Sequence, residues 1–506
     1  MPERRGVLLT GATGFLGQYL LRDLLRQAYP VAVLVRDAPP QTASERIDCL
    51  VQFWSDRLGQ ELPTPTVVTG DLGQEDLGLD GADRRWLGVN CQRLIHAAAS
   101  LSFRPTPDGE PWRTNLRGTQ ALLALSREIG LTEWHHVSSA FVCGRQTGII
   151  AEELAPRPSF HNAYEESKWQ AERAVRGELG VRATVYRPSV IVGDSRQGHA
   201  THFHGLYRFL ELATRLAAPD GAHTPLRLPL TGDETWNLVP VDWVSRAVIE
   251  LAARPLCHGR TFHLVSATPV STRWIRDVAS DLLSLPEVEF AWPGGVGDPS
   301  RLEQWFLDGI REYWPYLGGN PTFACTNTRA ALPDLPPPAI DRPVLERLIR
   351  FAVAVRWGRA PQEIHRHRSR AASEGCADYI ERVFPQQARR SELARAAGLD
   401  LTVGIDVHGA GGGQWSCTWR QGEFAHTRRG LEPGATVTYH TDTATFQAIV
   451  SRKQTPQQAF FEQRLDITGD VETALKLAVL FGQLLEETSV SQSHRTEVTH
   501  SASLHC

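Results

Sequence analysis

The sequence predicts an α/β protein: a Rossmann doubly wound parallel sheet with a small substrate lobe, followed by a separate α+β domain. Three observations support this fold class. Strand-like apolar runs alternate with helix-like segments from residue 6 to 195, which is typical of a parallel sheet. A glycine-rich turn joins the first strand to the first helix. From about residue 374, short alternating strands and further helices replace this pattern.

The glycine-rich turn lies between an apolar strand, 7–9, and a segment with helical apolar spacing, 15–26. Gly11 allows a sharp turn, Gly14 allows the backbone to approach a pyrophosphate, and Gly17 allows the helix to pack on the strand. The first amides of that helix then face the phosphates. A strand before the turn and a helix after it are the context that this motif requires. The sequence therefore predicts a dinucleotide site, with an ordinary strand–helix turn as the alternative.

The choice of cofactor depends on Arg36, which follows the second predicted strand, 31–35. An acidic residue there would hold the ribose hydroxyls of NAD, whereas arginine can pair with the 2′-phosphate of NADP. NADPH is favoured, and a solvated arginine is the alternative. Asp71, at the end of the third strand, is expected to reach the adenine or to cap a turn. The expected cofactor-binding residues are Thr10, Gly11, Thr13, Gly14, Phe15, Leu16, Gly17, Arg36, Asp71, Leu72, Ala97, Ala98, Asn115, Lys168 and Pro188.

Three residues carry the predicted chemistry. Tyr164 and Lys168 are four apart, so they share one face of a helix. The lysine ammonium is expected to lower the pKa of the phenol, which would let Tyr164 exchange a proton near neutral pH. Ser139, at the end of the fifth predicted strand, can hydrogen-bond the same substrate oxygen.

Composition excludes several classes of function. A net charge of −4 over 506 residues gives no reason to expect a nucleic-acid partner. The eight cysteines form no CxxC pair, which suits reduced thiols in a cytoplasmic protein. We expect no signal peptide and no membrane span, because no apolar run is long enough. Two histidine pairs, 202/204 and 365/367, have no third ligand at a suitable spacing, so no metal site is expected.

Residues 1 to about 195 resemble the extended short-chain dehydrogenase/reductase family. The resemblance rests on the glycine turn 10–17, on Ser138–Ser139, and on Tyr164 with Lys168. It implies that Ser139, Tyr164 and Lys168 are catalytic and that Lys168 also holds the nicotinamide ribose.

A narrower resemblance is to fatty acyl-CoA reductases and carrier-protein thioester reductases of the male-sterility type. It rests on segments 70–72, 77–79, 96–103, 186–193 and 237–244. It implies a reductase domain at 1–357 with a substrate lobe largely at 196–340.

The last part of the chain, 374–490, resembles sterol-carrier-protein-type lipid-binding domains. Segments 435–438, 445–446 and 465–470 carry this resemblance, which implies an apolar cavity for acyl chains or sterols. An apolar core without a cavity is the alternative. Residues 358–373 are expected to be a linker, and 491–506 a disordered tail.

These features lead to one expected function and two alternatives. The expected function is NADPH-dependent reduction of a lipid-like acyl thioester, from coenzyme A or a carrier protein, to the aldehyde, with the alcohol as the product if a second hydride follows. A hydroxysteroid or other alcohol dehydrogenase of the same family would use the same three catalytic residues. A redox-silent lipid carrier gated by NADP(H) would have no need of all three.

Overall fold

The structure is a computed structural model that describes residues 6–477 apart from 40, 181–182, 216–224, 284, 286, 292–294, 318–320, 359–373, 390–398, 410, 451–453, 455, 463, 471–472 and 474–476. The chain divides into two compact units, one of residues 1–214 and 225–360 and one of residues 215–224 and 361–506. The predicted tail and almost all of the predicted linker lie outside the described residues, so these boundaries stay predictions.

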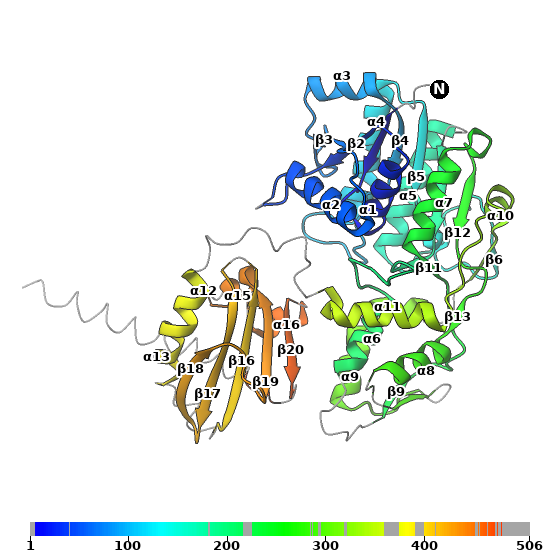
Figure 1. The fold of residues 1–506 in the computed structure, drawn as a ribbon. Helices are drawn as coiled ribbons and strands as arrows, with labels where there is room; N and C mark the ends of the chain where they lie inside the picture. Colours follow the sequence, from blue (N-terminus) through cyan, green and yellow to red (C-terminus); the bar gives the residue numbers. More distant parts are fainter. Residues whose placement is uncertain are drawn as a thin grey trace, which may run out of the picture. The chain divides into compact units, whose positions relative to one another are not determined.

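A seven-stranded sheet forms the centre of the first unit, and every neighbouring pair of its strands is parallel. The order β12-β7-β5-β4-β1-β2-β3 reverses direction at β1, as in a doubly wound sheet. The predicted Rossmann-like fold is therefore confirmed (Figure 1). The strands are β1 (Gly6–Thr10), β2 (Val31–Val35), β3 (Thr66–Thr69), β4 (Cys91–His96), β5 (Glu133–Val137), β7 (Ala183–Pro188) and β12 (Thr261–Leu264).

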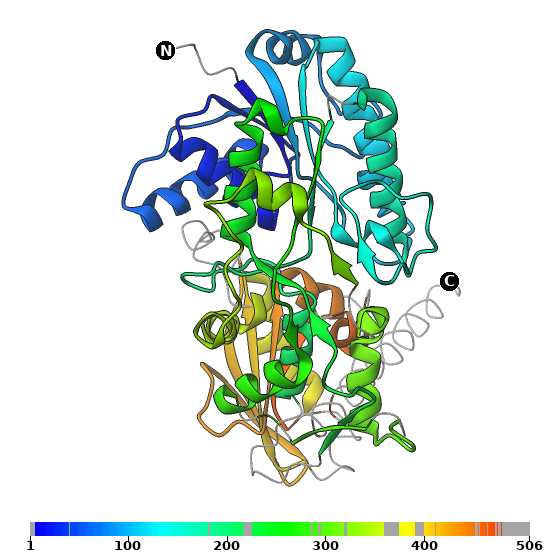
Figure 2. The same ribbon diagram turned by 90° about the vertical axis from the view of Figure 1, so that its right-hand side faces the viewer.

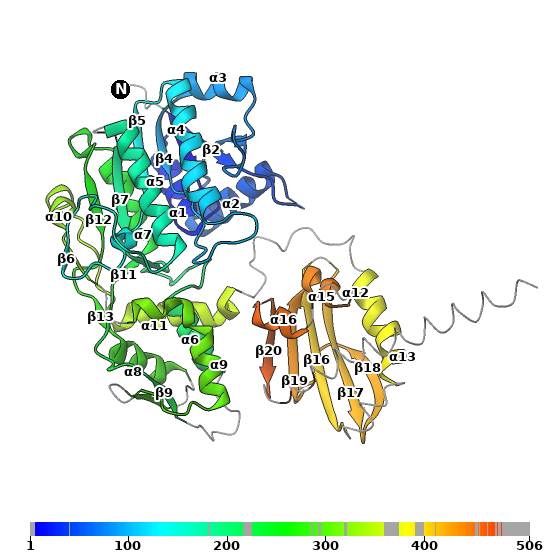
Figure 3. The same ribbon diagram turned by 180° about the vertical axis from the view of Figure 1, so that it is seen from behind.

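Helices cover both faces of this sheet (Figures 2 and 3). Val7 and Leu9 of β1 belong to one core with α1, α2 and α7, while Leu8 belongs to the other core with α3, α4 and α5. The alternation follows from the period of two along a strand. The helices are α1 (Phe15–Arg26), α2 (Ala43–Leu58), α3 (Gly81–Asn90), α4 (Gly118–Ile129), α5 (Ala163–Leu179) and α7 (Val241–Ala252).

The fifth strand differs from its prediction. The sequence predicts the fifth strand at 135–142, but β5 ends at Val137 and the short helix η2 (Ala140–Cys143) takes the place of its last residues. The Ser139 hydroxyl accepts a hydrogen bond from the amide of Phe141, 3.2 Å away, and so caps η2. This local bond competes with strand pairing, as serine side chains commonly do.

A smaller lobe is built from several segments of the range 190–358. Its paired strands are β8 (Val190–Val192) with β11 (Leu238–Pro240), β9 (Leu226–Leu228) with β14 (Val288–Phe290), and β10 (Thr235–Trp236) with β13 (Val270–Ser271). Its helices include α6 (Leu206–Arg215), α8 (Thr272–Leu282), α9 (Arg301–Gly309), η5 (Arg311–Tyr316) and α11 (Arg342–Ala354). Two elements inside the predicted lobe, α7 and β12, instead belong to the sheet and its helical layer.

The second unit contains a five-stranded sheet of order β18-β17-β16-β19-β20. Its strands are β16 (Leu401–His408), β17 (Gly413–Arg420), β18 (Glu423–Arg429), β19 (Val437–Asp442) and β20 (Leu465–Gly469), and its helices include α15 (Thr443–Val450) and α16 (Pro456–Phe461). The prediction of a separate α+β domain is confirmed. The alternating strands of this region predict antiparallel pairing. Three of the four described strand pairs of this sheet are antiparallel, but β19 returns beside β16 in the same direction.

Across the described part of the chain, no helix combines the length and the apolar character that a membrane span needs.

Two histidines are buried side by side in the sheet. His96 ends β4 and His136 lies in β5, and neither side chain is more than 1% exposed. Burial lowers the pKa of His96 to about 3 and that of His136 well below its ordinary value. Both imidazoles are therefore neutral in the folded protein at mildly acidic pH.

We predict that these histidines make the protein acid-sensitive. In the unfolded chain they titrate at a pKa of about 6.5, so below that pH the unfolded state binds more protons than the folded state. As the pH is lowered below this value, the free energy of unfolding should fall by up to about 1.4 kcal/mol per pH unit for each such histidine. Urea unfolding of the His136→Asn variant at several pH values should show a correspondingly smaller slope. A slope equal to that of the unmodified protein would contradict the prediction.

Candidate active site

The predicted site residues lie at one edge of the sheet, because they follow the carboxyl ends of parallel strands. Thr10 ends β1, Arg36 follows β2, Ala97 and Ala98 follow β4, and Pro188 ends β7. Asp71, Leu72 and Ser139 lie beyond the ends of β3 and β5. Residues far apart in the sequence therefore meet around the switch in strand order.

The glycine turn has the geometry that a bound dinucleotide requires. Gly11 has φ +77°, and a Cβ there would lie 2.6 Å from the amide nitrogen of Ala98. A Cβ at Gly17 would lie 1.8 Å from the Gly11 carbonyl oxygen, so the start of α1 packs directly against the turn. The helix begins after Gly14, which has no side chain to cap it. The helix therefore begins with three backbone amides that have no carbonyl acceptor within the helix, those of Phe15, Leu16 and Gly17. Such amides can donate hydrogen bonds to a phosphate.

A second arginine accompanies Arg36 beside this turn. Arg46 of α2 donates to the Arg36 carbonyl oxygen at 2.7 Å and to the Thr13 hydroxyl at 3.1 Å. The Arg36 guanidinium lies 4.0 Å from the Asp71 carboxylate and is 60% exposed. Our sequence reasoning missed Arg46, because a single arginine on a helix carries no motif. Arg46 therefore contacts the glycine turn directly, with the backbone of Arg36 next to it.

Buried hydrogen bonds fix the strand ends around the turn. The Thr10 hydroxyl lies 2.7 Å from His96 Nδ1 and accepts from the Ala98 amide at 3.4 Å. Asn115, in η1 (Arg113–Arg117), donates to the Ser100 carbonyl oxygen at 3.0 Å and accepts from the Ser100 amide at 2.8 Å. It also donates to Ser167 of α5 at 2.9 Å. Asn115 thus joins the loop after β4 to the helix that carries Tyr164 and Lys168.

The three predicted catalytic residues come together at the start of α5. Asn162 caps this helix by accepting from the Glu165 amide at 3.0 Å, which places Tyr164 in the first turn. Lys168, one turn later, is 2% exposed and donates from Nζ to the Val137 carbonyl oxygen at 2.7 Å.

The protonation of Tyr164 differs from the expectation. Burial raises the pKa of Tyr164 to about 12, and its hydrogen bond with Ser139 lowers the pKa only in part. Lys168 does not lower the pKa of the phenol as expected, and its Nζ donates to the Val137 carbonyl oxygen. Burial also lowers the pKa of Lys168 to about 8, against an opposing effect of Glu172. At pH 7 Tyr164 is therefore a neutral hydrogen-bond donor beside a lysine that is mostly charged.

Glu172 is a buried carboxylate that fixes this arrangement. It accepts from the Ser138 hydroxyl at 2.7 Å, from Arg187 of β7 at 2.7 and 3.1 Å, and from Arg176 at 2.9 Å. Burial alone would raise the pKa of Glu172, but these partners lower it to about 2. Because Glu172 lies one turn after Lys168 and bonds the neighbour of Ser139, it holds α5, β5 and β7 in one relative position.

The small lobe contacts the catalytic helix through Tyr316 of η5. Its hydroxyl donates to Glu165 Oε1 at 2.5 Å and accepts from Asn162 at 2.7 Å. Its ring lies 5.9 Å from that of Phe103, and the Phe103 ring lies 6.1 Å from that of Tyr164. Sequence reasoning missed these residues, because aromatic residues of the lobe carry no motif and their contacts depend on its fold.

Comparisons with known proteins match two families to different parts of this chain. Residues 9–248 match the family described as "Male sterility protein", and residues 380–482 match the "SCP-2 sterol transfer family". The aldehyde reductase lnaA of Aspergillus flavus is 27% identical over 68% of this chain and 36% of its own length. The nonribosomal peptide synthetase asaC of the same species is 27% identical over 56% of this chain and 29% of its own length. The chain thus spans about a third of the length of these curated relatives.

The fold of the chain is also similar to that of a solved structure. The crystal structure of the terminal R domain from the myxalamid PKS-NRPS biosynthetic pathway matches with a TM-score of 0.57 and 26% identity. The match covers 72% of this chain and 94% of that domain.

We predict that Gly17→Ala weakens nucleotide binding. The added Cβ must displace the Gly11 carbonyl oxygen, which opens the turn. Affinity for NADPH, measured by titration calorimetry, should fall by about tenfold or more, which corresponds to about 1.4 kcal/mol. Gly177→Ala in α5 is the matched control, since a Cβ there meets nothing within 4 Å. Unchanged affinity in Gly17→Ala would refute this account of the turn.

We also predict that Glu172→Gln destabilises the first unit strongly. Removing the charge leaves Arg187 buried without its anion, which typically costs about 3–5 kcal/mol. Glu178→Gln, in the same helix, removes a more exposed pairing with Arg127 and should cost less than about 1 kcal/mol. Denaturant unfolding of the two variants measures both values. Equal losses would show that the buried carboxylate has no special role.

Proposed function

We propose that this chain reduces acyl thioesters. The chain is an NAD(P)-binding oxidoreductase of the male-sterility type of extended short-chain dehydrogenase/reductases, joined to an SCP-2-type domain. The proposal rests on the hydrogen bond of Tyr164 with Ser139 and on Lys168 one turn later in α5, near the same sheet edge as the glycine turn. Similarity to a terminal R domain over nearly all of that domain supports thioesters over sterol alcohols.

The side chains suggest how the reduction proceeds. NADPH, when bound, supplies hydride to the thioester carbonyl carbon. As the carbonyl oxygen gains negative charge, the Tyr164 phenol donates a proton to it and the Ser139 hydroxyl donates a hydrogen bond. A neutral phenol suits this direction of reaction, because a phenolate has no proton to give. The hemithioacetal then releases thiol and leaves the aldehyde, and a second reduction gives the alcohol.

Cofactor preference follows from the two arginines beside the glycine turn. Arg36 follows β2, and Arg46 donates to its carbonyl oxygen and to Thr13 of the glycine turn, so both would border the adenosine ribose of a bound dinucleotide. Their charges would pair with the 2′-phosphate of NADPH, and Lys168 would hold the nicotinamide ribose. The remaining predicted cofactor residues, among them Asp71, Leu72, Asn115 and Pro188, would complete this site.

The substrate is proposed to be a lipid-like acyl group on a carrier protein or on coenzyme A. The similarity to a nonribosomal peptide synthetase and to a PKS-NRPS R domain favours the carrier protein as donor. The SCP-2-type domain would bind the apolar chain or shield the aldehyde from water. We place the reaction in the cytoplasm, where the cysteines would stay reduced.

The proposed activity is tested by measuring NADPH consumption and thiol release together. Purified full-length chain is given acyl-coenzyme A and acyl-carrier-protein substrates of several chain lengths. We expect thiol to appear with NADPH consumption, and the ratio of the two separates aldehyde from alcohol production. Oxidation of sterol alcohols without any thiol release would overturn the proposal.

Tyr164→Phe isolates the role of the phenol. The variant keeps the aromatic ring but removes the proton donor, so turnover should fall by about 10²-fold or more. Affinity for NADPH, measured by fluorescence titration, should change little. Tyr29→Phe, outside the site, serves as the control. A Tyr164→Phe variant with normal turnover would exclude the proposed mechanism.

A further inference from the structure

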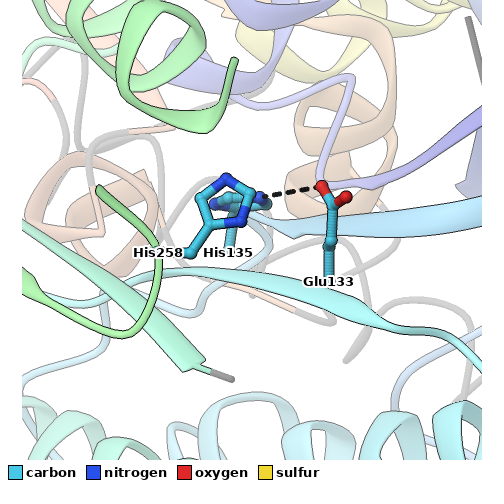
Figure 4. A group of neighbouring side chains, drawn as sticks. All are labelled: Glu133, His135 and His258. Atoms are coloured by element: carbon cyan, nitrogen blue, oxygen red, sulfur yellow. Dashed lines mark ion pairs between the residues drawn. The ribbon is translucent and has the colours of Figure 1, made fainter. Parts of the chain in front are cut away.

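A cluster of two histidines and a glutamate lies away from the catalytic residues. Glu133 and His135 lie two residues apart on β5, and His258 follows the short helix η4 (Pro255–Cys257). One potential ligand atom from each residue lies within 4.8 Å of the others. Figure 4 shows the two imidazole rings side by side, with the Glu133 carboxylate directed towards His135.

The histidine at the centre of the cluster has an unused buried nitrogen. His135 is fully buried, and its Nε2 has no hydrogen-bond partner. That nitrogen lies 3.9 Å from Glu133 Oε2, which is too long for a hydrogen bond. An unused lone pair or N–H in a buried site is costly unless something occupies the space beside it.

The far nitrogens of both rings are held by oxygen atoms. His135 Nδ1 lies 2.9 Å from the Tyr186 hydroxyl, and His258 Nε2 lies 3.0 Å from the Ala252 carbonyl oxygen. A carbonyl can only accept, so His258 Nε2 carries the proton and Nδ1 has a free lone pair. Metal-bound histidines characteristically donate their second N–H to an oxygen in this way.

The third side chain is oriented and reachable from solvent. Arg93 of β4 donates from Nε to Glu133 Oε2 at 2.6 Å, which fixes the carboxylate next to the rings. The Glu133 side chain is 27% exposed and His258 is half-buried, which gives an ion a path to the buried nitrogen.

We propose that Glu133, His135 and His258 form a binding site for a divalent transition-metal ion of the zinc class. Two imidazole nitrogens and one carboxylate oxygen form a ligand set that Zn²⁺ accepts, with water in the fourth position. In a tetrahedral zinc site with bonds of about 2.0–2.1 Å, ligand atoms lie roughly 3.4 Å apart. The 3.9 Å between His135 Nε2 and Glu133 Oε2 needs only a small contraction.

The position of the cluster indicates a structural role for the ion. Glu133 begins β5, whereas Ser139 lies beyond the other end of the same strand. The ion would join β5 to the loop before β12, which is an outer strand of the sheet. It would therefore stabilise the folded first unit without touching the reacting atoms.

The test uses full-length chain without a histidine tag, freed of metal with a chelator. Zn²⁺ binding is followed by equilibrium dialysis with elemental analysis, and Co²⁺ is used as a spectroscopic probe. We expect one tightly bound equivalent, visible d–d absorption of Co²⁺ in a low-symmetry nitrogen and oxygen site, and a higher melting temperature with Zn²⁺.

Three variants show which residues bind the ion. His258→Ala and Glu133→Gln should each lose that equivalent, or lower its affinity about tenfold or more. His426→Ala, in the second unit, is the control and should bind as the unmodified chain does. Circular dichroism of the metal-free proteins checks that the variants fold. Absence of a tight equivalent, or its retention in well-folded His258→Ala and Glu133→Gln, would overturn the proposal.

Discussion

The buried carboxylate of Glu172 is the interaction on which the geometry of the active site depends. It bonds Ser138 after β5, Arg187 on β7, and Arg176 on its own helix. A buried charge is tolerated only where it is fully paired, so these partners cannot move independently. The serine, the tyrosine and the lysine are carried by the two elements that this carboxylate joins. The ion-pair network of Glu172 therefore fixes the positions of these three residues relative to one another, although none of them is part of the network.

The same edge of the sheet shows how burial tunes the chemistry. Burial raises the pKa of Tyr164 and lowers that of Lys168, so the phenol stays neutral and the Lys168 ammonium loses its proton more readily than a solvated lysine does. A neutral phenol is suited to donating a proton in a reduction. The small lobe contacts the same helix, because the Tyr316 hydroxyl donates to Glu165, next to Tyr164. The lobe is therefore tied directly to the helix that carries Tyr164 and Lys168.

The second unit has a mixed sheet, whereas the central sheet of the first unit is parallel. Its mixed sheet places Val403, Cys417 and Trp419 in a buried layer, with β16 paired in parallel to β19 and antiparallel to β17. Match to the SCP-2 sterol transfer family makes it the natural candidate for binding an apolar chain. In the proposed reaction this domain would hold the poorly soluble acyl chain of the substrate or of the aldehyde.

The sequence by itself determined the features that depend on local spacing. The glycine turn, α1 and β2 have the bounds or geometry that their residues predict, because periodicity and glycine conformation act over a few residues. The parallel sheet also followed from the alternation of strands and helices. The positions of Ser139, Tyr164 and Lys168 at one edge then followed from that topology.

Only the tertiary structure decided the properties that depend on distant partners. The raised pKa of Tyr164, the bonds of Arg46 to the glycine turn, and the parallel pairing of β16 with β19 all arise between segments remote in sequence. The same holds for His258 beside Glu133 and His135. Burial and long-range contacts have no local pattern, and so the sequence alone could not supply them.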